Sequence, residues 1–215
     1  MEKKLSFWLI AAMYVFSAAA QKNDIVEGRR SYLVINAGVA VPIMCYASKD
    51  VNNPDAGFAK PGFSIDLGYA YRFNKTLGIT GSVFYTINKA GSSNVKAITS
   101  PGTFRVFGLM AGPVLTANFS DRWAGDVKFL AGIAKTMTPE LQYRDETLLN
   151  RYGATAFSWG GTAGLRYDLN KHTFLNLQAG HINLKPQFKK KAGETGKGEQ
   201  HIVLMNFDAG VGWKL

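Results

Sequence analysis

The chain has 215 residues, of which 47% are hydrophobic, 13% aromatic and 19% charged, and its formal net charge is +10. After residue 20 no apolar run approaches the roughly 20 residues that a membrane-spanning helix needs, which excludes a bundle of such helices. A single cysteine, Cys45, excludes an intramolecular disulfide.

The first 20 residues have the pattern of a secretory signal peptide. Two lysines form a positive start, residues 5–16 are an apolar stretch, and residues 17–20 supply a small-residue cleavage site. An uncleaved anchor helix is the alternative, but the apolar stretch is short for one. Cleavage would make Gln21 the first mature residue, so we expect residues 21–215 to form one exported domain. Export argues against nucleic acid as a partner, despite the basic charge.

Large apolar residues alternate with small or charged ones along most of the mature chain. Residues 63–73 show this most clearly, because every odd position is large and apolar or aromatic and every even position is small or charged. Such alternation predicts a β-strand with two unlike faces. The other segments that follow this pattern are 31–42, 77–87, 123–133, 157–169, 173–184 and 203–215.

Two segments depart from the pattern. Within residues 77–87, Gly81 and Phe84 have the wrong parity. Residues 103–117 are strand-like, but Arg105 and Phe107 share one parity, which we interpret as a β-bulge or as a face partly buried in lipid. With this segment the sequence predicts about eight strands.

The connections between these strands are alternately short and long. Three short ones, expected to be tight hairpin turns, are residues 74–76, 118–122 and 170–172. Four long ones are residues 43–60, 88–102, 135–152 and 185–199. In an up-and-down barrel this order places every long loop at one end and every short turn at the other, which is the asymmetry of bacterial outer-membrane barrels.

Alternation alone does not say which face looks inward, because a soluble lipocalin-like barrel alternates with its apolar face around a ligand. Small residues dominate the polar face, which suits a narrow lumen, and the strands are long enough to span a membrane when tilted. Aromatic residues also gather at both ends of the apolar face, as in the girdles at the two membrane interfaces. They are Tyr71, Phe73, Trp123, Tyr167 and Trp213 at the short-turn end, and Phe63, Tyr85 and Phe157 at the loop end. We therefore predict an all-β fold, a closed up-and-down antiparallel transmembrane β-barrel.

Residues 68–75, Gly-Tyr-Ala-Tyr-Arg-Phe-Asn-Lys, are partly repeated at 164–171 as Gly-Leu-Arg-Tyr-Asp-Leu-Asn-Lys. With the signal peptide, the alternating strands and the terminal strand 207–215, these runs make the chain resemble the small outer-membrane barrels of the OmpA/OmpX kind, particularly the outer-membrane β-barrel domain family common in Bacteroidetes. The resemblance covers the mature chain and implies a bacterial outer-membrane location. It also implies that barrel-assembly machinery recognises the terminal strand. Leu215 departs from the usual terminal aromatic residue, although Trp213 keeps the right parity.

The polar face carries charges of both signs. Unpaired charges in a narrow interior are costly, so we expect ion pairs in a plugged, water-poor lumen. A narrow polar path for ions or small solutes is the alternative, although side chains just about fill an eight-stranded barrel. The members of this predicted charge network are Asp66, Arg72, Asp126, Lys128, Arg166, Asp168, Asp208 and Lys214.

The sequence gives no support for catalysis, a cofactor or a metal. We expect His181 and His201 on the outer face near the loop end, where some outer-membrane hydrolases carry a His-x-Ser pair. Asn183 occupies the serine position, so the nucleophile is missing and we expect no enzymatic activity. Cys45, at the start of a predicted loop, is interpreted as a small apolar filler.

The last long loop is rich in lysine. A solvated loop is the first interpretation, and contact with lipopolysaccharide phosphates is the second. Its lysines are Lys185, Lys189, Lys190, Lys191 and Lys197. The functional prediction is a non-enzymatic outer-membrane barrel with a structural, adhesive or accessory role through four long outer loops. The alternatives are a narrow porin-like channel and a soluble lipocalin-like ligand-binding barrel.

Overall fold

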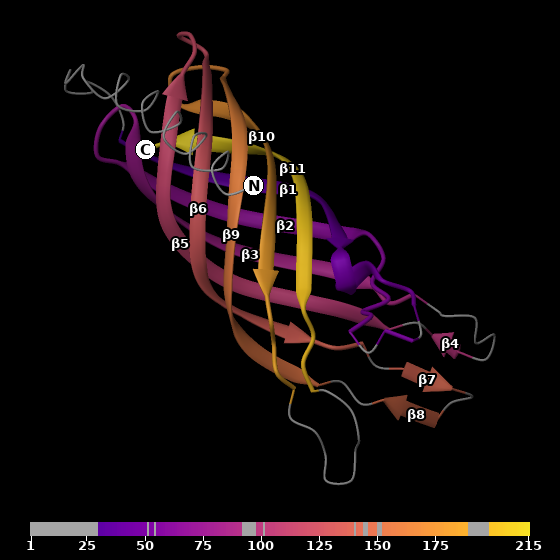
Figure 1. Cartoon of the computed structure of the whole chain (residues 1–215). Helices are drawn as coiled ribbons and strands as arrows, with labels where there is room; N and C mark the ends of the chain where they lie inside the picture. Colours follow the sequence, from indigo (N-terminus) through magenta and orange to yellow (C-terminus); the bar gives the residue numbers. More distant parts are fainter. Residues whose placement is uncertain are drawn as a thin grey trace, which may run out of the picture.

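The computed structural model describes residues 30–50, 52–53, 55–91, 98–100, 102–139, 141–143, 146–149, 152–188 and 198–215. The predicted signal peptide lies outside the described residues. Eight strands close into an antiparallel barrel in the order β1-β11-β10-β9-β6-β5-β3-β2 (Figure 1). Their bounds are β1 Ser31–Ile43, β2 Gly62–Arg72, β3 Leu77–Lys89, β5 Thr103–Asn118, β6 Trp123–Met137, β9 Gly153–Asp168, β10 Thr173–Leu184 and β11 Ile202–Lys214. The predicted closed, up-and-down β-barrel is confirmed.

The barrel closes between the first and the last strand. β1 pairs with β11 from Tyr32 opposite Lys214 to Ile43 opposite Val203. The backbone N–H of Leu215 donates to the carbonyl of Ser31 at 2.8 Å, which extends the seam by one bond. Each barrel strand therefore has a partner on both sides, as a sheet in lipid requires.

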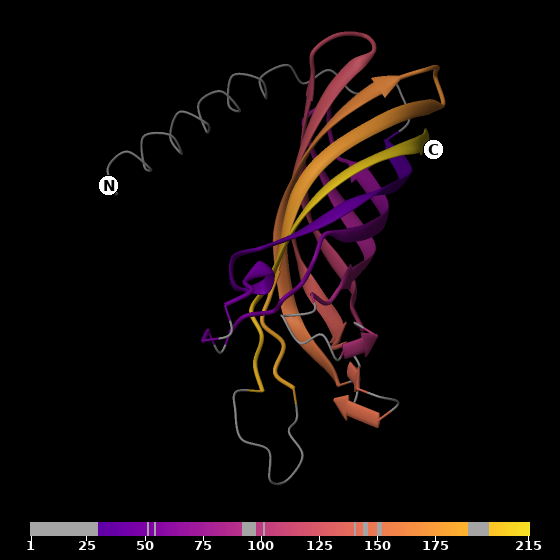
Figure 2. The same ribbon diagram turned by 90° about the vertical axis from the view of Figure 1, so that its right-hand side faces the viewer.

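Figures 1 and 2 show the short turns at the end of the barrel where the described chain starts and finishes, and the long connections at the opposite end. We call these the turn end and the loop end. In each of the three short turns an asparagine or serine side chain accepts backbone N–H groups two or three residues further along; Asn74 and Asn170 both do so. Such side chains stabilise tight turns, which keeps this end compact.

Large apolar side chains point outward around the barrel. Ile35, Leu109, Phe129 and Leu177 are 44%, 55%, 58% and 58% exposed, although such residues normally form a core. The apolar face is therefore the outer one. Among the described residues no helix has the length and apolarity to cross a membrane.

The predicted bulge in residues 103–117 is wrong. β5 keeps one register with β6 on both sides of Pro113, whose missing N–H interrupts the hydrogen bonds but not the alignment. The pattern looked irregular because β5 places large apolar residues inside as well as outside. Phe84 on β3 does the same, since it points inward and is 2% exposed.

Two long connections contribute a second, three-stranded sheet that the sequence did not predict. It consists of β4 Ile98–Ser100, β7 Leu141–Tyr143 and β8 Glu146–Leu149 in the order β4-β7-β8. Figures 1 and 2 show it beyond the loop end of the barrel. The connection from β1 to β2 carries a 3-10 helix, η1, Met44–Ala47.

Candidate functional site

The barrel interior is the first candidate site, and the side chains in it form three layers. The loop-end layer is apolar, and we call it the plug. It consists of Ala40, Tyr46, Ala59, Phe84, Ala90, Phe104, Val106, Met110, Leu130, Ala134, Ile182, Leu184, Ile202 and Leu204. The expectation of a lumen lined throughout by small and charged residues is therefore wrong at this end.

Tyr46 belongs to η1 and inserts into the plug from the loop end. It is fully buried and meets the ring of Phe104 edge-on at 5.3 Å between centroids. The loop holds it there through hydrogen bonds from the backbone N–H of Gly57 to the carbonyl of Cys45 (2.8 Å) and from that of Ala59 to the carbonyl of Tyr46 (3.0 Å). A Cβ at Gly57 would lie 2.6 Å from the Tyr46 carbonyl oxygen, so this close approach requires glycine.

Strain and an unmet hydrogen bond accompany this insertion. Met44 and Phe58, at the two ends of the inserted segment, have positive φ angles of 55° and 53°, which non-glycine residues rarely adopt. The Tyr46 hydroxyl has no hydrogen-bond partner among the described residues, and burial raises the pKa of this phenol. Cys45 beside it is a half-buried free thiol.

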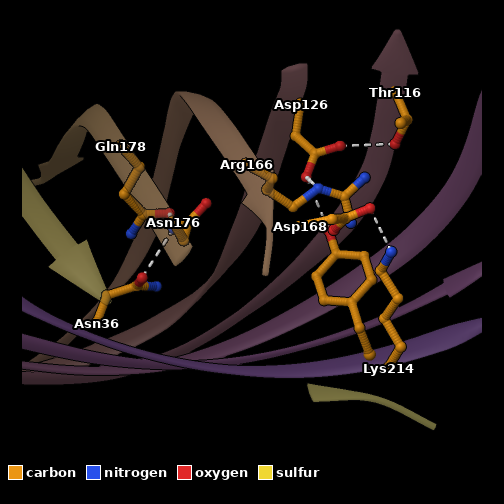
Figure 3. A network of polar contacts seen from close by, with 9 residues as sticks. Asn36, Thr116, Asp126, Arg166, Asp168, Asn176, Gln178 and Lys214 are labelled. Carbon is orange, nitrogen blue, oxygen red and sulfur yellow. Dashed lines mark hydrogen bonds and ion pairs between the residues drawn. The ribbon is translucent and has the colours of Figure 1, made fainter. Parts of the chain in front are cut away.

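The middle layer is polar and centres on two carboxylates, Asp66 and Asp208. Gln178 Nε2 lies 3.4 Å from an oxygen of each. Asn36 donates to Asp66 at 3.1 Å, and Asn176 donates to Asn36 at 2.8 Å (Figure 3). The hydroxyls of two serines complete the layer, Ser82 donating to Asp66 and Ser64 to Asp208.

A cavity of about 30 Å³ lies beside this layer, lined by Asp66, Lys128 and Asp208 among others. One water needs roughly 10–15 Å³ on this measure, so the cavity has room for about two. Lys128 is 7% exposed, and no ion pair to it is found in the described part of the chain. The lumen thus contains a small polar pocket with room for about two waters.

The turn-end layer combines aromatic rings with paired charges. Asp126 Oδ2 lies 3.0 Å from Arg166 Nε and accepts a hydrogen bond from the Tyr32 hydroxyl at 3.1 Å. Thr116 donates to the other oxygen of Asp126 at 2.6 Å (Figure 3). The Arg166 guanidinium lies over the Tyr32 ring, 4.6 Å from its centroid, which adds a cation–π contact.

The eight residues of the predicted charge network therefore lie in two layers. Asp66, Lys128 and Asp208 lie in the middle, and the other five lie toward the turn end. Lys214 Nζ and Asp168 Oδ2 form a second ion pair at 2.5 Å, and Arg72 lies near Asp126 and Asp168. The neutral partners of these charges were not predicted from the sequence; they are Tyr32, Asn36, Ser64, Ser82, Thr116, Asn176 and Gln178. Their even positions on predicted strands were the available signal.

The predicted aromatic girdles fall on the outer face at both ends. At the turn end, Trp123 and Tyr167 lie opposite each other on β6 and β9 with ring centroids 4.8 Å apart. Tyr71 and Phe73 are 5.8 Å apart, and Trp213 is 40% exposed. At the loop end, Phe63 and Phe157 are exposed and Tyr85 is half-buried.

The last long connection is described only at its two ends. Lys185 Nζ forms an exposed ion pair with Glu199 at 2.5 Å, and hydrogen bonding to Glu199 raises the pKa of this lysine. Lys189, Lys190, Lys191 and Lys197 lie outside the described residues.

His181 and His201 each contact an uncharged side chain. The His181 ring meets Trp159 edge-on at 5.5 Å, and His201 Nε2 lies 3.1 Å from Asn183 Oδ1. In the described ranges no three His, Cys, Asp or Glu residues gather as metal ligands would.

A closed barrel with an apolar exterior, short turns at one end and long loops at the other defines the class of transmembrane outer-membrane barrels. The chain belongs to the outer membrane protein beta-barrel domain family, whose sequence model matches residues 8–214. The protein is therefore located in the bacterial outer membrane, and the soluble ligand-binding alternative does not hold.

Three solved structures illustrate the likeness in fold. Neisserial surface protein A (NspA) superposes with a TM-score of 0.56 at 15% identity, covering 86% of this chain and 97% of that chain. OprG of Pseudomonas aeruginosa gives 0.53 at 12% identity, with coverage of 89% and 99%. Ail, the attachment invasion locus protein of Yersinia pestis, gives 0.50 at 16% identity, with coverage of 86% and 98%. No curated protein sequence matches the chain. At these identities the likeness is one of fold.

Proposed function

We propose that this protein is a non-enzymatic surface-contact protein, in which the barrel is a membrane anchor and the loop end makes the contacts. The plug carries this proposal. An ion crossing it would lose its hydration to aliphatic and aromatic side chains that offer no replacement, which is costly. A filled barrel leaves the outer connections as the part able to meet a partner, and loops on a rigid scaffold commonly carry function.

The structure of the loop end supports this proposal. The sheet β4-β7-β8 gives two of the long connections a defined backbone, which reduces the entropy lost when a partner binds. The names of two proteins of similar fold fit this role, an attachment invasion locus protein and a surface protein.

A loop replacement tests the proposal. Met137 and Gly153 lie directly opposite each other, so residues 138–152 can be replaced by a two-residue Asn-Gly turn that leaves β6 and β9 in register. We expect a non-adherent bacterium to bind cultured epithelial cells when it expresses the full chain and to lose this binding with the shortened loop. Heat-modifiable migration in gels checks that the variant still forms a barrel. Equal adherence of the two strains would contradict the proposal.

Planar-bilayer recording separates this role from the narrow channel. The purified full chain should give no discrete conductance. Steady single-channel steps would favour the porin-like alternative and overturn the proposed role.

We also propose that the C-terminal strand is the segment recognised by barrel-assembly machinery. Trp213 is exposed to lipid and has the parity expected of that signal. Trp213→Ala should lower the assembled fraction in cells without preventing refolding in detergent, whereas Leu215→Phe should raise it. Equal assembly of all three proteins in cells would rule this out.

A further inference from the structure

Three cations form a row on the outer face at the loop end, which we call the basic row. Lys89, Arg105 and Lys135 occupy odd, outward positions on the adjacent strands β3, β5 and β6. Lys89 is opposite Thr103, two residues from Arg105, and Arg105 is opposite Met137, two residues from Lys135. Consecutive members are therefore diagonal neighbours on one face, about 7–8 Å apart and within reach of long side chains.

The basic row lies at the edge of the apolar outer face. On each strand the residue two positions closer to the membrane centre, and so on the same face, is apolar: Ile87, Phe107 and Ile133. Phe107 and Ile133 are 54% and 60% exposed. The row thus marks the boundary where lipid tails give way to headgroups.

No carboxylate on these strands opposes the row. β3 and β5 contain no Asp or Glu, and the one acidic residue of β6, Asp126, points into the lumen. Lys89 and Lys135 are exposed, and Arg105 is half-buried with its Nε lacking a hydrogen-bond partner among the described residues. Lys185 differs, because Glu199 neutralises it.

We propose that the basic row binds the phosphate groups of lipopolysaccharide in the outer leaflet, through its lipid A moiety. The partner must be anionic, lie in the plane of the headgroups and present more than one anionic group to a row of three cations. Arginine can hold a phosphate with two parallel hydrogen bonds, and the flanking lysines add point charges. The exposed apolar residues beneath the row would contact the acyl chains. This inference does not depend on the adhesive role.

The first test uses the unmodified protein. Full-length chain in detergent micelles is titrated with phosphorylated lipid A and, separately, with enzymatically dephosphorylated lipid A. We expect at least tenfold tighter binding of the phosphorylated form, weakening as salt is added. Equal binding of the two lipids would overturn the proposal, and this comparison requires no variant to fold.

The second test locates the site. The triple variant Lys89→Gln, Arg105→Gln, Lys135→Gln should lose at least tenfold in affinity for phosphorylated lipid A. The matched control, Lys75→Gln, Arg122→Gln, Lys171→Gln, removes the same charge at the turn end and should bind as wild type does. An equal loss in both triple variants would assign binding to net charge alone and contradict the site. Arg105→Lys keeps the charge but loses the two-bond geometry, so it should fall between wild type and the triple variant.

Discussion

Arg166 Nε lies 3.0 Å from Asp126 Oδ2 inside the barrel, and both side chains are at most 4% exposed. Removing one partner leaves the other buried without its counter-charge, which costs about 3–5 kcal/mol. Asp126→Ala and Arg166→Met should each destabilise the barrel by this order. The double variant should cost much less than the sum of the two, because neither charge is then stranded. Urea unfolding in detergent micelles measures all three, and strictly additive effects would show that the ion pair is not coupled.

The assignment of the outer face can be tested by placing an arginine at two depths in the membrane. Leu67 lies in the middle of β2 and is 43% exposed to the membrane. Leu67→Arg should cost about 2–4 kcal/mol in a lipid bilayer, whereas Leu169→Arg, in a turn beyond β9, should cost about 0–1 kcal/mol. Reversible unfolding in liposomes compares them. Equal costs at the two positions would contradict the assignment of the outer face.

Tyr46 gives a stability contribution that depends on pH. Burial raises the pKa of its phenol above the usual 10.0, so its stabilising effect is complete below pH 10. Above pH 10 the unfolded chain ionises first, and folding stability falls by up to about 1.4 kcal/mol per pH unit. Tyr46→Phe removes this term and the unpartnered hydroxyl. At pH 8 the free energy of unfolding of Tyr46→Phe should therefore lie between that of wild type and about 1 kcal/mol above it. At pH 11 its advantage over wild type should be larger.

Unfolding curves collected between pH 8 and pH 11 would measure this difference. A gap between wild type and Tyr46→Phe that stays constant over the range would show that Tyr46 is accessible to ionisation in the folded state. Tyr46→Ala is the packing control, and at pH 8 it should be destabilised by about 3–5 kcal/mol because it leaves a cavity. Its deficit relative to wild type should shrink at pH 11, because it also lacks the ionisable phenol.

Gly212 and Phe174 lie opposite each other on β11 and β10. A Cβ at Gly212 would lie 2.1 Å from the Phe174 ring, which packs edge-on against Tyr32 and cannot move freely. Gly212→Ala should therefore cost about 1–3 kcal/mol. Phe174→Leu in the same chain should restore part of that loss. If Phe174→Leu does not raise the stability of the Gly212→Ala variant, the Phe174 ring is not the group that excludes the methyl group.

The strand positions could be predicted from the sequence because a membrane barrel imposes a period of two on nearly every strand. Each of the eight predicted segments overlaps a barrel strand, and the alternation of short and long connections set the two ends correctly. The exception at Phe84 was an accurate signal, since Phe84 does point inward.

The plug could not be predicted, because the inference from alternation assumed one kind of interior from end to end. Met110, Leu130 and Leu204 are inward residues that look like lipid-facing ones when only polarity is considered. The loop that delivers Tyr46 shows no periodicity, and the short strands β4, β7 and β8 are too brief to give one. Contacts between residues that are far apart in the sequence produce no periodic alternation of polarity, so they cannot be predicted from it.

The seam between β1 and β11 has a consequence for how the molecule is made. The strands β1 and β11 must meet before the sheet has no free edge, so an incomplete barrel has unpaired N–H and C=O groups until these two strands pair. Lipid cannot satisfy those groups. Insertion strand by strand is therefore unfavourable. Pairing of β11, the barrel strand made after the other seven, with β1 completes the hydrogen bonding that allows the barrel to lie in lipid.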